Sequence, residues 1–253
     1  MTHPAGATVL VTGASAGFGQ AIARRFAALG ARVVGTGRRA ERLEALREEL
    51  GDRFVPLVFD VGDRTAVDAA LGTLSDAFAR VDVLVNNAGL ALGLDPVWEG
   101  DLDDWDAMVR TNIDGVLYCT RALLPGMVAR KRGHVVNISS VAGSWPYPGG
   151  HVYGATKAFV TQLSLAMRCD LLGTGVRVTS IEPGLAETEF SLVRFKGDPQ
   201  AAARPYAGVE SLTAEDIAEA VVWAVSQPRH VNINRVEIMA TEQAWGSFAI
   251  HRG

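Results

Sequence analysis

The chain has 253 residues, with 24 Lys and Arg against 28 Asp and Glu, for a formal net charge of -4. This length fits one large α/β domain with a full hydrophobic core, and the dispersed basic residues argue against a nucleic-acid surface or an anionic membrane surface. No apolar run approaches the roughly 20 residues of a membrane span, and residues 1–6 are too short and too polar for a signal peptide. We therefore expect a cytoplasmic protein whose partner is a small molecule.

Short apolar runs alternate with longer amphipathic stretches along the whole chain, a pattern typical of a parallel sheet with helices on both faces. Strands are predicted at 7–12, 31–36, 54–59, 82–86, 134–139, 176–181 and 236–239, and helices at 17–29, 39–50, 63–79, 103–130, 152–172 and 214–226. Thr213 to Asp216 resembles a capping box at the start of the last helix, with Asp in place of Glu or Gln. The pattern predicts a Rossmann-like, doubly wound, seven-stranded parallel sheet in a single domain, 1–253.

Two features stand outside this alternation. Residues 185–208 have weak periodicity and mix Pro, Gly, Arg and aromatic residues, so we predict a mobile lid there. Cys119 and Cys169 both lie in apolar, helix-like sequence without CxxC spacing or nearby histidine pairs, which indicates reduced core residues and no metal site.

A glycine-rich turn follows the first predicted strand. The strand stops at Gly13 and the helix begins near Gly17, so backbone without side chains can approach a ligand closely. Bare N–H groups and the positive end of the helix dipole favour a phosphate there. The GxxxGxG spacing departs from the GxGxxG fingerprint of many dinucleotide folds, so the turn alone is a near match.

The second predicted strand ends in Arg38 and Arg39, where an NAD site would place an acid on the ribose hydroxyls. Two guanidinium groups suit a 2′-phosphate instead, which predicts NADP(H) over NAD(H). The alternative, that both merely decorate a helix start, is disfavoured by the helix dipole. Asp60 and Val61, after the third strand, are predicted to flank the adenine, and Asn87 with the neighbouring Ala88 and Gly89 to adjoin the ribose.

A reactive trio lies in the second half of the chain. Tyr153 and Lys157 stand four residues apart, so on a helix they share a face, and the ammonium group can stabilise a phenolate. Ser140 ends a predicted buried strand, and such strand ends are where α/β active sites gather. A YxxxK pair alone is common on helix surfaces, but this one stands with the serine, the glycine turn and Asn86 to Gly89. We interpret the trio as a proton-transfer site.

Together these motifs resemble the short-chain dehydrogenase/reductase family in its single-domain form, over essentially the whole chain. The resemblance implies that Tyr153 is the acid/base, that Ser140 polarises the substrate oxygen, and that Lys157 lowers the tyrosine pKa and holds the nicotinamide ribose. It further implies that Asn112 supports a water chain to the lysine, and that the enzyme is a homotetramer built through the helices at 103–130 and 152–172. The expected cofactor-binding residues are Thr12, Gly13, Ser15, Gly17, Phe18, Gly19, Arg38, Arg39, Asp60, Val61, Asn87, Ala88, Gly89, Tyr153, Lys157, Pro183, Gly184 and Thr188.

Shorter segments narrow the resemblance to two groups. Ser144 to Tyr147, Tyr153 to Phe159 and Val193 to Asp198 resemble NADP-dependent 3-hydroxy acid dehydrogenases, which implies L-allo-threonine, serine or 3-hydroxypropionate/malonic semialdehyde as substrate. Arg168 to Gly175, Ala186 to Phe190 and Gln243 to Trp245 are also similar to sulfoacetaldehyde reductases, which form isethionate. Both substrate classes carry an anion about two carbons from the reacting oxygen, so one pocket could serve either.

The expected substrate-binding residues are Ser140, Tyr147, Tyr153, Arg194 and Gln243. Arg194 is predicted to pair with the substrate anion, because a guanidinium binds a carboxylate or sulfonate bidentately. The alternative for Arg194 is an exposed lid charge or a subunit contact. A different class of function, a non-catalytic NADP-binding sensor or scaffold, also fits the fold, but the intact trio and Asn112 argue against it.

Overall fold

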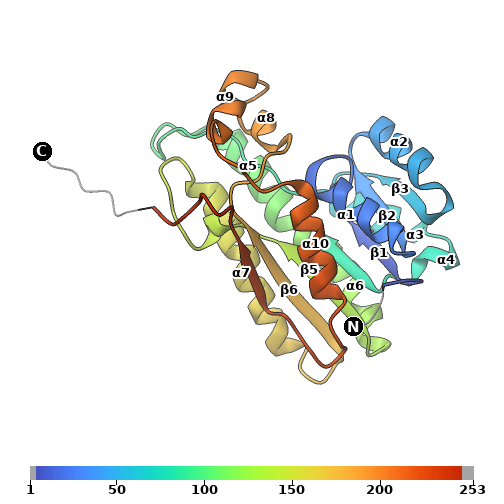
Figure 1. Cartoon of the computed structure of the whole chain (residues 1–253). Coiled ribbons are helices and arrows are strands. Elements are labelled where there is room, and N and C mark those ends of the chain that lie inside the picture. The colour runs from blue at the N-terminus through green and yellow to red at the C-terminus, as the bar shows by residue number, and fades with distance from the viewer. Residues whose placement is uncertain (1–3, 247–253) are drawn as a thin grey trace, which may run out of the picture.

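The computed structural model describes residues 4–246. Within that range, seven parallel strands form one sheet in the order β3-β2-β1-β4-β5-β6-β7, which confirms the predicted fold class. The order reverses between β1 and β4, so this is a doubly wound sheet with its switch point at its centre. The strands are β1 Thr8–Val11, β2 Arg32–Gly37, β3 Phe54–Val58, β4 Val83–Asn86, β5 Gly133–Ile138, β6 Val176–Pro183 and β7 Arg235–Ile238 (Figure 1).

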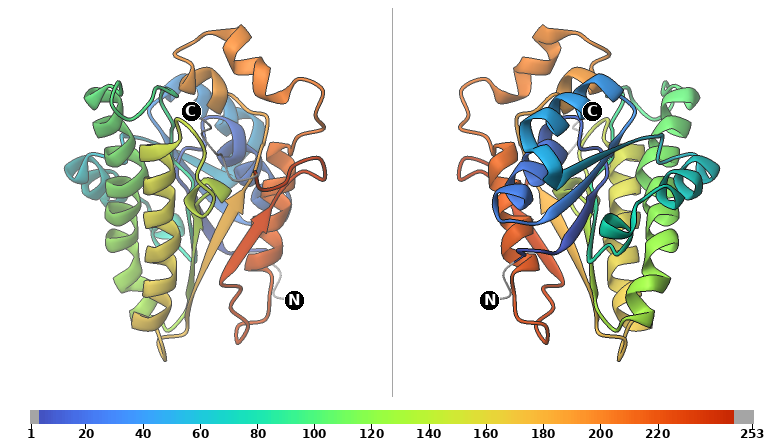
Figure 2. Two further views of the ribbon diagram at one scale, coloured as in Figure 1. Left: turned by 90° about the vertical axis from the view of Figure 1, so that its left-hand side faces the viewer. Right: turned by 90° about the vertical axis from the view of Figure 1, so that its right-hand side faces the viewer.

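Alternate residues of the strands feed two separate cores. In β1, Val9 and Val11 point into a core under α1, α2 and α10, whereas Leu10 points into the core under α3, α6 and α7. Figure 2 shows these two helical layers on opposite faces of the sheet. The helices are α1 Gly17–Ala28, α2 Ala40–Leu50, α3 Arg64–Gly72, α4 Asp76–Ala79, α5 Leu102–Val109, α6 Gly115–Ala129, α7 His151–Asp170, α8 Phe190–Arg194, α9 Pro199–Ala203 and α10 Ala214–Val225.

Two predicted helices are interrupted. The helix expected at 63–79 is α3 and α4, separated by a break at Thr73, whose hydroxyl donates to the carbonyl of Ala70 and ends α3. The helix expected at 103–130 is α5 and α6 joined by a π-helical turn, Arg110–Asp114. Such turns widen a helix locally and often occur at functional sites.

Two smaller predictions have different outcomes. The capping box before α10 is present: the Thr213 hydroxyl accepts from the backbone N–H of Asp216 at 3.2 Å, and the Asp216 carboxylate accepts from that of Thr213 at 2.8 Å. The prediction that both cysteines are core residues is wrong for Cys169, which is exposed in the last turn of α7, while Cys119 is buried. Among residues 4–246, no helix combines the length and apolar character needed to cross a lipid bilayer.

The segment predicted to be a lid contains structure that periodicity did not show. It holds α8, α9 and a 3₁₀-turn, Arg204–Tyr206, each no longer than five residues and therefore too short for a visible repeat. Figure 2 shows α8 and α9 above one end of the sheet, following the carboxyl end of β6. This end is where ligands bind in doubly wound folds.

Candidate active site

A cavity of about 350 Å³ opens at this end of the sheet, between the glycine turn, the trio and the segment after β6. Every expected cofactor-binding residue except Thr12 and Gly19 lines it, and so does Ser140. Asn112, Tyr147, Arg194 and Gln243 do not line it. Lining residues that the sequence analysis did not single out are Ala16, Gly37, Phe59, Leu90, Thr111, Ile138, Ser139, Ala186, Glu189, Phe190 and Val193.

Thr12 and Gly19 shape the glycine turn from behind the cavity wall. The Thr12 hydroxyl accepts from the backbone N–H groups of Asn87 at 3.0 Å and Ala88 at 2.9 Å, which joins the turns after β1 and β4. Gly19 is buried, and a Cβ there would collide with the carbonyl group of Gly13 and the side-chain amide of Asn87. Both residues therefore set the path of the backbone.

The start of α1 offers an anion site. Its N-cap residue, Ala16, provides no side-chain hydrogen bond, and the first turn contains no acidic residue. The first N–H groups of α1 therefore have no capping side chain and can bind phosphate oxygens. Gly17 has φ +50°, and a Cβ on it would lie 3.5 Å from Thr188, so this turn faces the predicted lid, residues 185–208. The turn fits a dinucleotide pyrophosphate.

Two arginines, Arg38 and Arg39, line the end of the cavity next to β2. The Arg39 guanidinium donates from Nε and Nη2 to the Ser15 hydroxyl at 3.3 and 3.1 Å, so it is fixed against the glycine turn. Arg38 is looser, with its side chain 67% exposed and a 3.7 Å ion pair to Asp60. Arg42, one helical turn further along, lies on the same side as Arg39 and was missed by the sequence analysis, although its i+3 spacing was a usable signal. This positive end suits a ribose 2′-phosphate.

The trio comes together as predicted. Tyr153 lies in the first turn of α7, and the Lys157 Nζ is 5.8 Å from the centroid of the Tyr153 ring and donates to the carbonyl of Ile138 at 2.9 Å. Ser140 follows β5 and its hydroxyl accepts from the backbone N–H of Ala142 at 3.1 Å. It also donates to the carbonyl of Pro183 at 3.3 Å. The serine is thereby held at the junction of β5 and β6.

Burial dominates the acid-base properties of the trio. It raises the pKa of Tyr153 well above the ordinary tyrosine value, while a hydrogen bond with Ser140 and the charge of Arg194 act in the opposite direction. Burial also lowers the pKa of Lys157 to about 8. Lys157 is not among the groups that shift the pKa of Tyr153, so the lowering of the tyrosine pKa by Lys157 stays a prediction. The phenol is protonated at neutral pH and is suited to donate a proton.

Asn112 is buried in the π-helical turn and joins two elements of the site. Its Oδ1 accepts from the backbone N–H of Leu90 at 2.9 Å, and its Nδ2 donates to the Leu90 carbonyl at 2.8 Å and the Thr156 hydroxyl at 3.0 Å. A Cβ on Gly89 would lie 3.2 Å from the Asn112 Oδ1 and 3.3 Å from the Lys157 Nζ. Asn112 and Lys157 therefore adjoin the same side of Gly89, and Asn112 connects the turn after β4 to α7.

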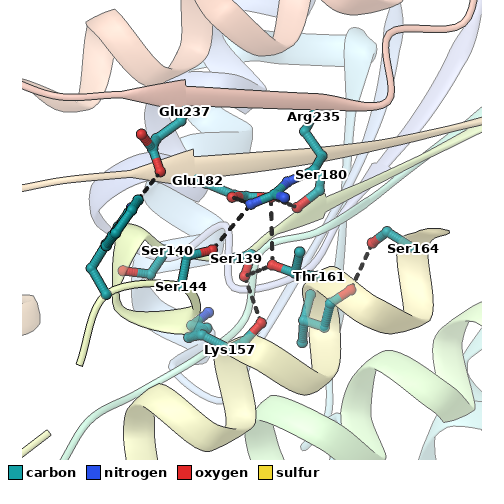
Figure 3. Close-up of polar contacts among 12 residues, drawn as sticks. Ser139, Ser140, Ser144, Lys157, Thr161, Ser164, Ser180, Glu182, Arg235 and Glu237 are labelled. Carbon is teal, nitrogen blue, oxygen red and sulfur yellow. Dashed lines mark hydrogen bonds and ion pairs between the residues drawn. The ribbon is translucent and has the colours of Figure 1, made fainter.

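A buried carboxylate network, which the sequence analysis missed, supports the trio from behind (Figure 3). Glu182 on β6 is fully buried and pairs with Arg235 on β7 through bonds of 2.9 and 2.6 Å. Its carboxylate also accepts from the Ser180 hydroxyl at 2.8 Å. Arg235 donates in addition to the Ser144 hydroxyl at 3.1 Å, in the turn that follows Ser140. An edge strand is thus connected to the loop that carries the serine.

The same network reaches the helix of the trio. The Thr161 hydroxyl lies 3.5 Å from the Glu182 carboxylate and 2.8 Å from the Ser139 hydroxyl. The Ser139 hydroxyl in turn donates to the backbone carbonyl of Lys157 at 2.7 Å, as Figure 3 shows. A fully satisfied polar network of this kind rigidifies the elements that it joins. The Ser139 hydroxyl is therefore engaged within this network, although Ser139 lines the cavity together with Ser140.

The residues predicted for the substrate are spread around Tyr153. The Arg194 guanidinium lies 5.4 Å from the centroid of the Tyr147 ring and 5.7 Å from that of Tyr153. Its Nε donates to the carbonyl of Gly93 at 3.3 Å. Gln243 has a different position, because its Oε1 accepts from the backbone N–H of Leu185 at 2.7 Å and holds the start of the segment 185–208, the predicted lid.

Comparisons with known proteins identify the family of the chain. Residues 7–197 match the short chain dehydrogenase family, and the chain belongs to this family. The chain is 56% identical over 245 residues to NADP-dependent 3-hydroxy acid dehydrogenase YdfG of Salmonella typhimurium, covering 96% of this chain and 99% of that protein. It is 55% identical over 245 residues to serine 3-dehydrogenase of Agrobacterium fabrum, covering 97% and 98%. The closed form of a serine dehydrogenase complexed with NADP+ superposes with a TM-score of 0.96 at 53% identity, covering 97% and 100%.

Proposed function

We propose that the protein is an NADP-dependent dehydrogenase of small 3-hydroxy acids such as serine, L-allo-threonine or 3-hydroxypropionate. The observation that carries the proposal is the guanidinium of Arg194 beside the ring of Tyr153, a residue that lines a cavity suited to a dinucleotide. The names of the two relatives and of the solved structure support the same substrate class.

The residues of the chain divide the work in a way that follows from their positions. NADP(H), when bound, accepts or supplies the hydride. The Tyr153 phenol exchanges a proton with the substrate oxygen, and the Ser140 hydroxyl hydrogen-bonds to that oxygen and polarises it. Arg194 pairs with the carboxylate and so fixes the distance between the anion and the reacting carbon. Lys157 is proposed to hold the nicotinamide ribose, and Thr188 to lie near the carboxamide.

The test compares substrates that differ in the anion. NADPH oxidation is measured with malonic semialdehyde, sulfoacetaldehyde and neutral propionaldehyde, and NADP+ reduction with serine and L-allo-threonine. For the wild type we expect the highest kcat/KM with malonic semialdehyde and measurable oxidation of the hydroxy acids. A preference for sulfoacetaldehyde would instead favour a sulfonate reductase, and no turnover with any of these substrates would favour a non-catalytic NADP-binding protein.

Arg194→Ala tests the anion contact directly. We expect kcat/KM for malonic semialdehyde to fall about 10- to 100-fold, since a hydrogen bond to a charged group contributes about 1.5–3 kcal/mol, whereas turnover of propionaldehyde should hardly change. Arg204→Ala is the matched control, because Arg204 is an exposed arginine of the same segment that is not near Tyr153 among the contacts described. An equal loss on both substrates in Arg194→Ala would contradict the assignment.

We also propose a cytoplasmic homotetramer. Exposed apolar side chains on α5, Leu102 at 67% and Val109 at 39%, support burial of this helix between subunits. Light scattering of the purified protein measures the mass, and a monomer at micromolar concentration would contradict the tetramer. Cell fractionation measures the location, and recovery of the protein outside the cytoplasmic fraction would contradict that part.

A further inference from the structure

A carboxylate of the lid lies between two arginines at the positive end of the cavity. The Glu189 carboxylate is 3.1 Å from the Nη1 of Arg39, and its two oxygens are 2.8 and 2.7 Å from the Nη1 of Arg42. The two arginines hold the pKa of Glu189 below its usual range, with Arg42 the stronger influence. This acid is therefore an anion at neutral pH, and it lines the cavity.

Glu189 belongs to a different part of the chain from its partners. It directly precedes α8 in the lid, about 150 residues after Arg39, which directly precedes α2 at the end of β2. Arg39 is also bonded to Ser15 of the glycine turn. The three residues thus form one chain of contacts, from the turn through the guanidinium to the lid.

The donors of Arg39 are limited in number. Its Nε and Nη2 are directed at Ser15, and its Nη1 is directed at Glu189. A dianionic 2′-phosphate arriving at this end would need donors that Glu189 now occupies, and the carboxylate would repel it. A ribose with a free 2′-hydroxyl carries no charge and would leave the pairs of Glu189 intact.

We propose that Glu189 is a specificity-determining residue that competes with the cofactor 2′-phosphate for Arg39 and Arg42. This inference rests on the proposed use of NADP(H). It adds Arg42 to the residues that a 2′-phosphate can recruit, since Glu189 releases Arg42 when it is displaced. It also links the two ends of the site, because the anion that must move belongs to the lid.

The experiment measures binding of fragments by titration calorimetry and requires no turnover. 2′,5′-ADP carries the 2′-phosphate and 5′-AMP lacks it, so the ratio of their dissociation constants isolates the phosphate contribution. In Glu189→Gln we expect 2′,5′-ADP to bind about 3- to 10-fold more tightly, because two partly exposed ion pairs no longer have to be broken, with 5′-AMP unchanged. Glu187→Gln is the matched control: it removes the same charge two residues away, from a side chain that pairs with neither arginine among the described ion pairs.

Four results would overturn the proposal. Binding of 2′,5′-ADP by Glu189→Gln that is unchanged or weaker would show that the carboxylate does not compete. Equal tightening of 2′,5′-ADP and 5′-AMP would show an effect of the lid on nucleotides in general. If Glu187→Gln binds 2′,5′-ADP more tightly by the same factor as Glu189→Gln, the effect comes from the lost negative charge in general. If the wild type itself binds 2′,5′-ADP no better than 5′-AMP, the NADP(H) assignment fails as well. A wild type that prefers 2′,5′-ADP, together with an unchanged Glu189→Gln, would mean that only the proposed competition fails.

Discussion

The two halves of the site are built by different means. The glycine turn after β1 offers backbone N–H groups to a ligand. Its glycines have no side chain, so the ligand can approach the backbone closely. The other half, where we propose that the reaction occurs, offers the hydroxyl, phenol and ammonium groups of Ser140, Tyr153 and Lys157, with the Arg194 guanidinium beside the tyrosine. Damage to the first half should therefore impair binding and stability, whereas damage to the second should impair chemistry.

The largest expected effect tests the reaction side. Tyr153→Phe removes the proposed proton donor while keeping the ring, whose centroid lies 5.6 Å from that of Phe190. We expect kcat to fall about 10³-fold, within the range for loss of a general acid, and the dissociation constant for NADPH to change less than about twofold. Steady-state kinetics and fluorescence titration with NADPH measure the two quantities. A folded variant with near-normal turnover would show that the tyrosine is not the proton donor.

The next effect tests the glycine turn and has a matched control in the lid. Gly19→Ala places a methyl group against the carbonyl of Gly13, so we expect the free energy of unfolding to fall by about 2 kcal/mol and NADPH binding to weaken. Gly208→Ala meets no atom within 4 Å, but its φ of +76° is strained for alanine, so we expect about 1 kcal/mol of destabilisation and normal NADPH binding. Urea denaturation and NADPH titration distinguish the two variants. If both variants bound NADPH equally weakly, the glycine turn would have no special role in binding the cofactor.

The smallest effect concerns the arginines at the far end of the turn. Arg39→Ala should raise the KM for NADPH about 10-fold relative to that for NADH, because Ser15 fixes this guanidinium and a charged hydrogen bond contributes about 1.5 kcal/mol or more. Arg38→Ala should shift the same ratio only about twofold, because its side chain is 67% exposed and is screened by solvent. The measurement is the KM for each cofactor in both variants. Equal changes for NADPH and NADH would contradict a 2′-phosphate contact.

The sequence predicted the parts of this molecule that depend on local pattern. Strand periodicity placed every end of the seven strands to within two residues, because alternating apolar residues follow from burial of one face. The glycine turn and the Tyr153–Lys157 pair were also readable, since their spacing along the chain fixes their geometry. The short helices of the lid and the π-helical turn at 110–114 were missed, because five residues carry no measurable period.

The parts that were missed depend on residues far apart in the chain. Glu189 meets Arg39 and Arg42 across about 150 residues, and Glu182 meets Arg235 across 53. Charged residues like these are common on surfaces, and nothing in their immediate sequence distinguishes a buried or paired acid from a solvated one. Only the fold brings the partners together. The exposure of Cys169 has the same origin, since an apolar neighbourhood in the sequence does not say which side of α7 faces the solvent.

The Glu182–Arg235 pair also bears on how the protein is made. Synthesis proceeds from the N-terminus, so a nascent chain can assemble β1 to β6 while Arg235 is still to be added by the ribosome. Until then Glu182 lacks the cation that offsets its burial, and the turn after Ser140 lacks the hydrogen bond that Arg235 donates to Ser144. The strand that completes the edge of the sheet therefore also completes the turn proposed to be catalytic, and we expect partly synthesised chains to gain activity only after nearly all of the protein has emerged.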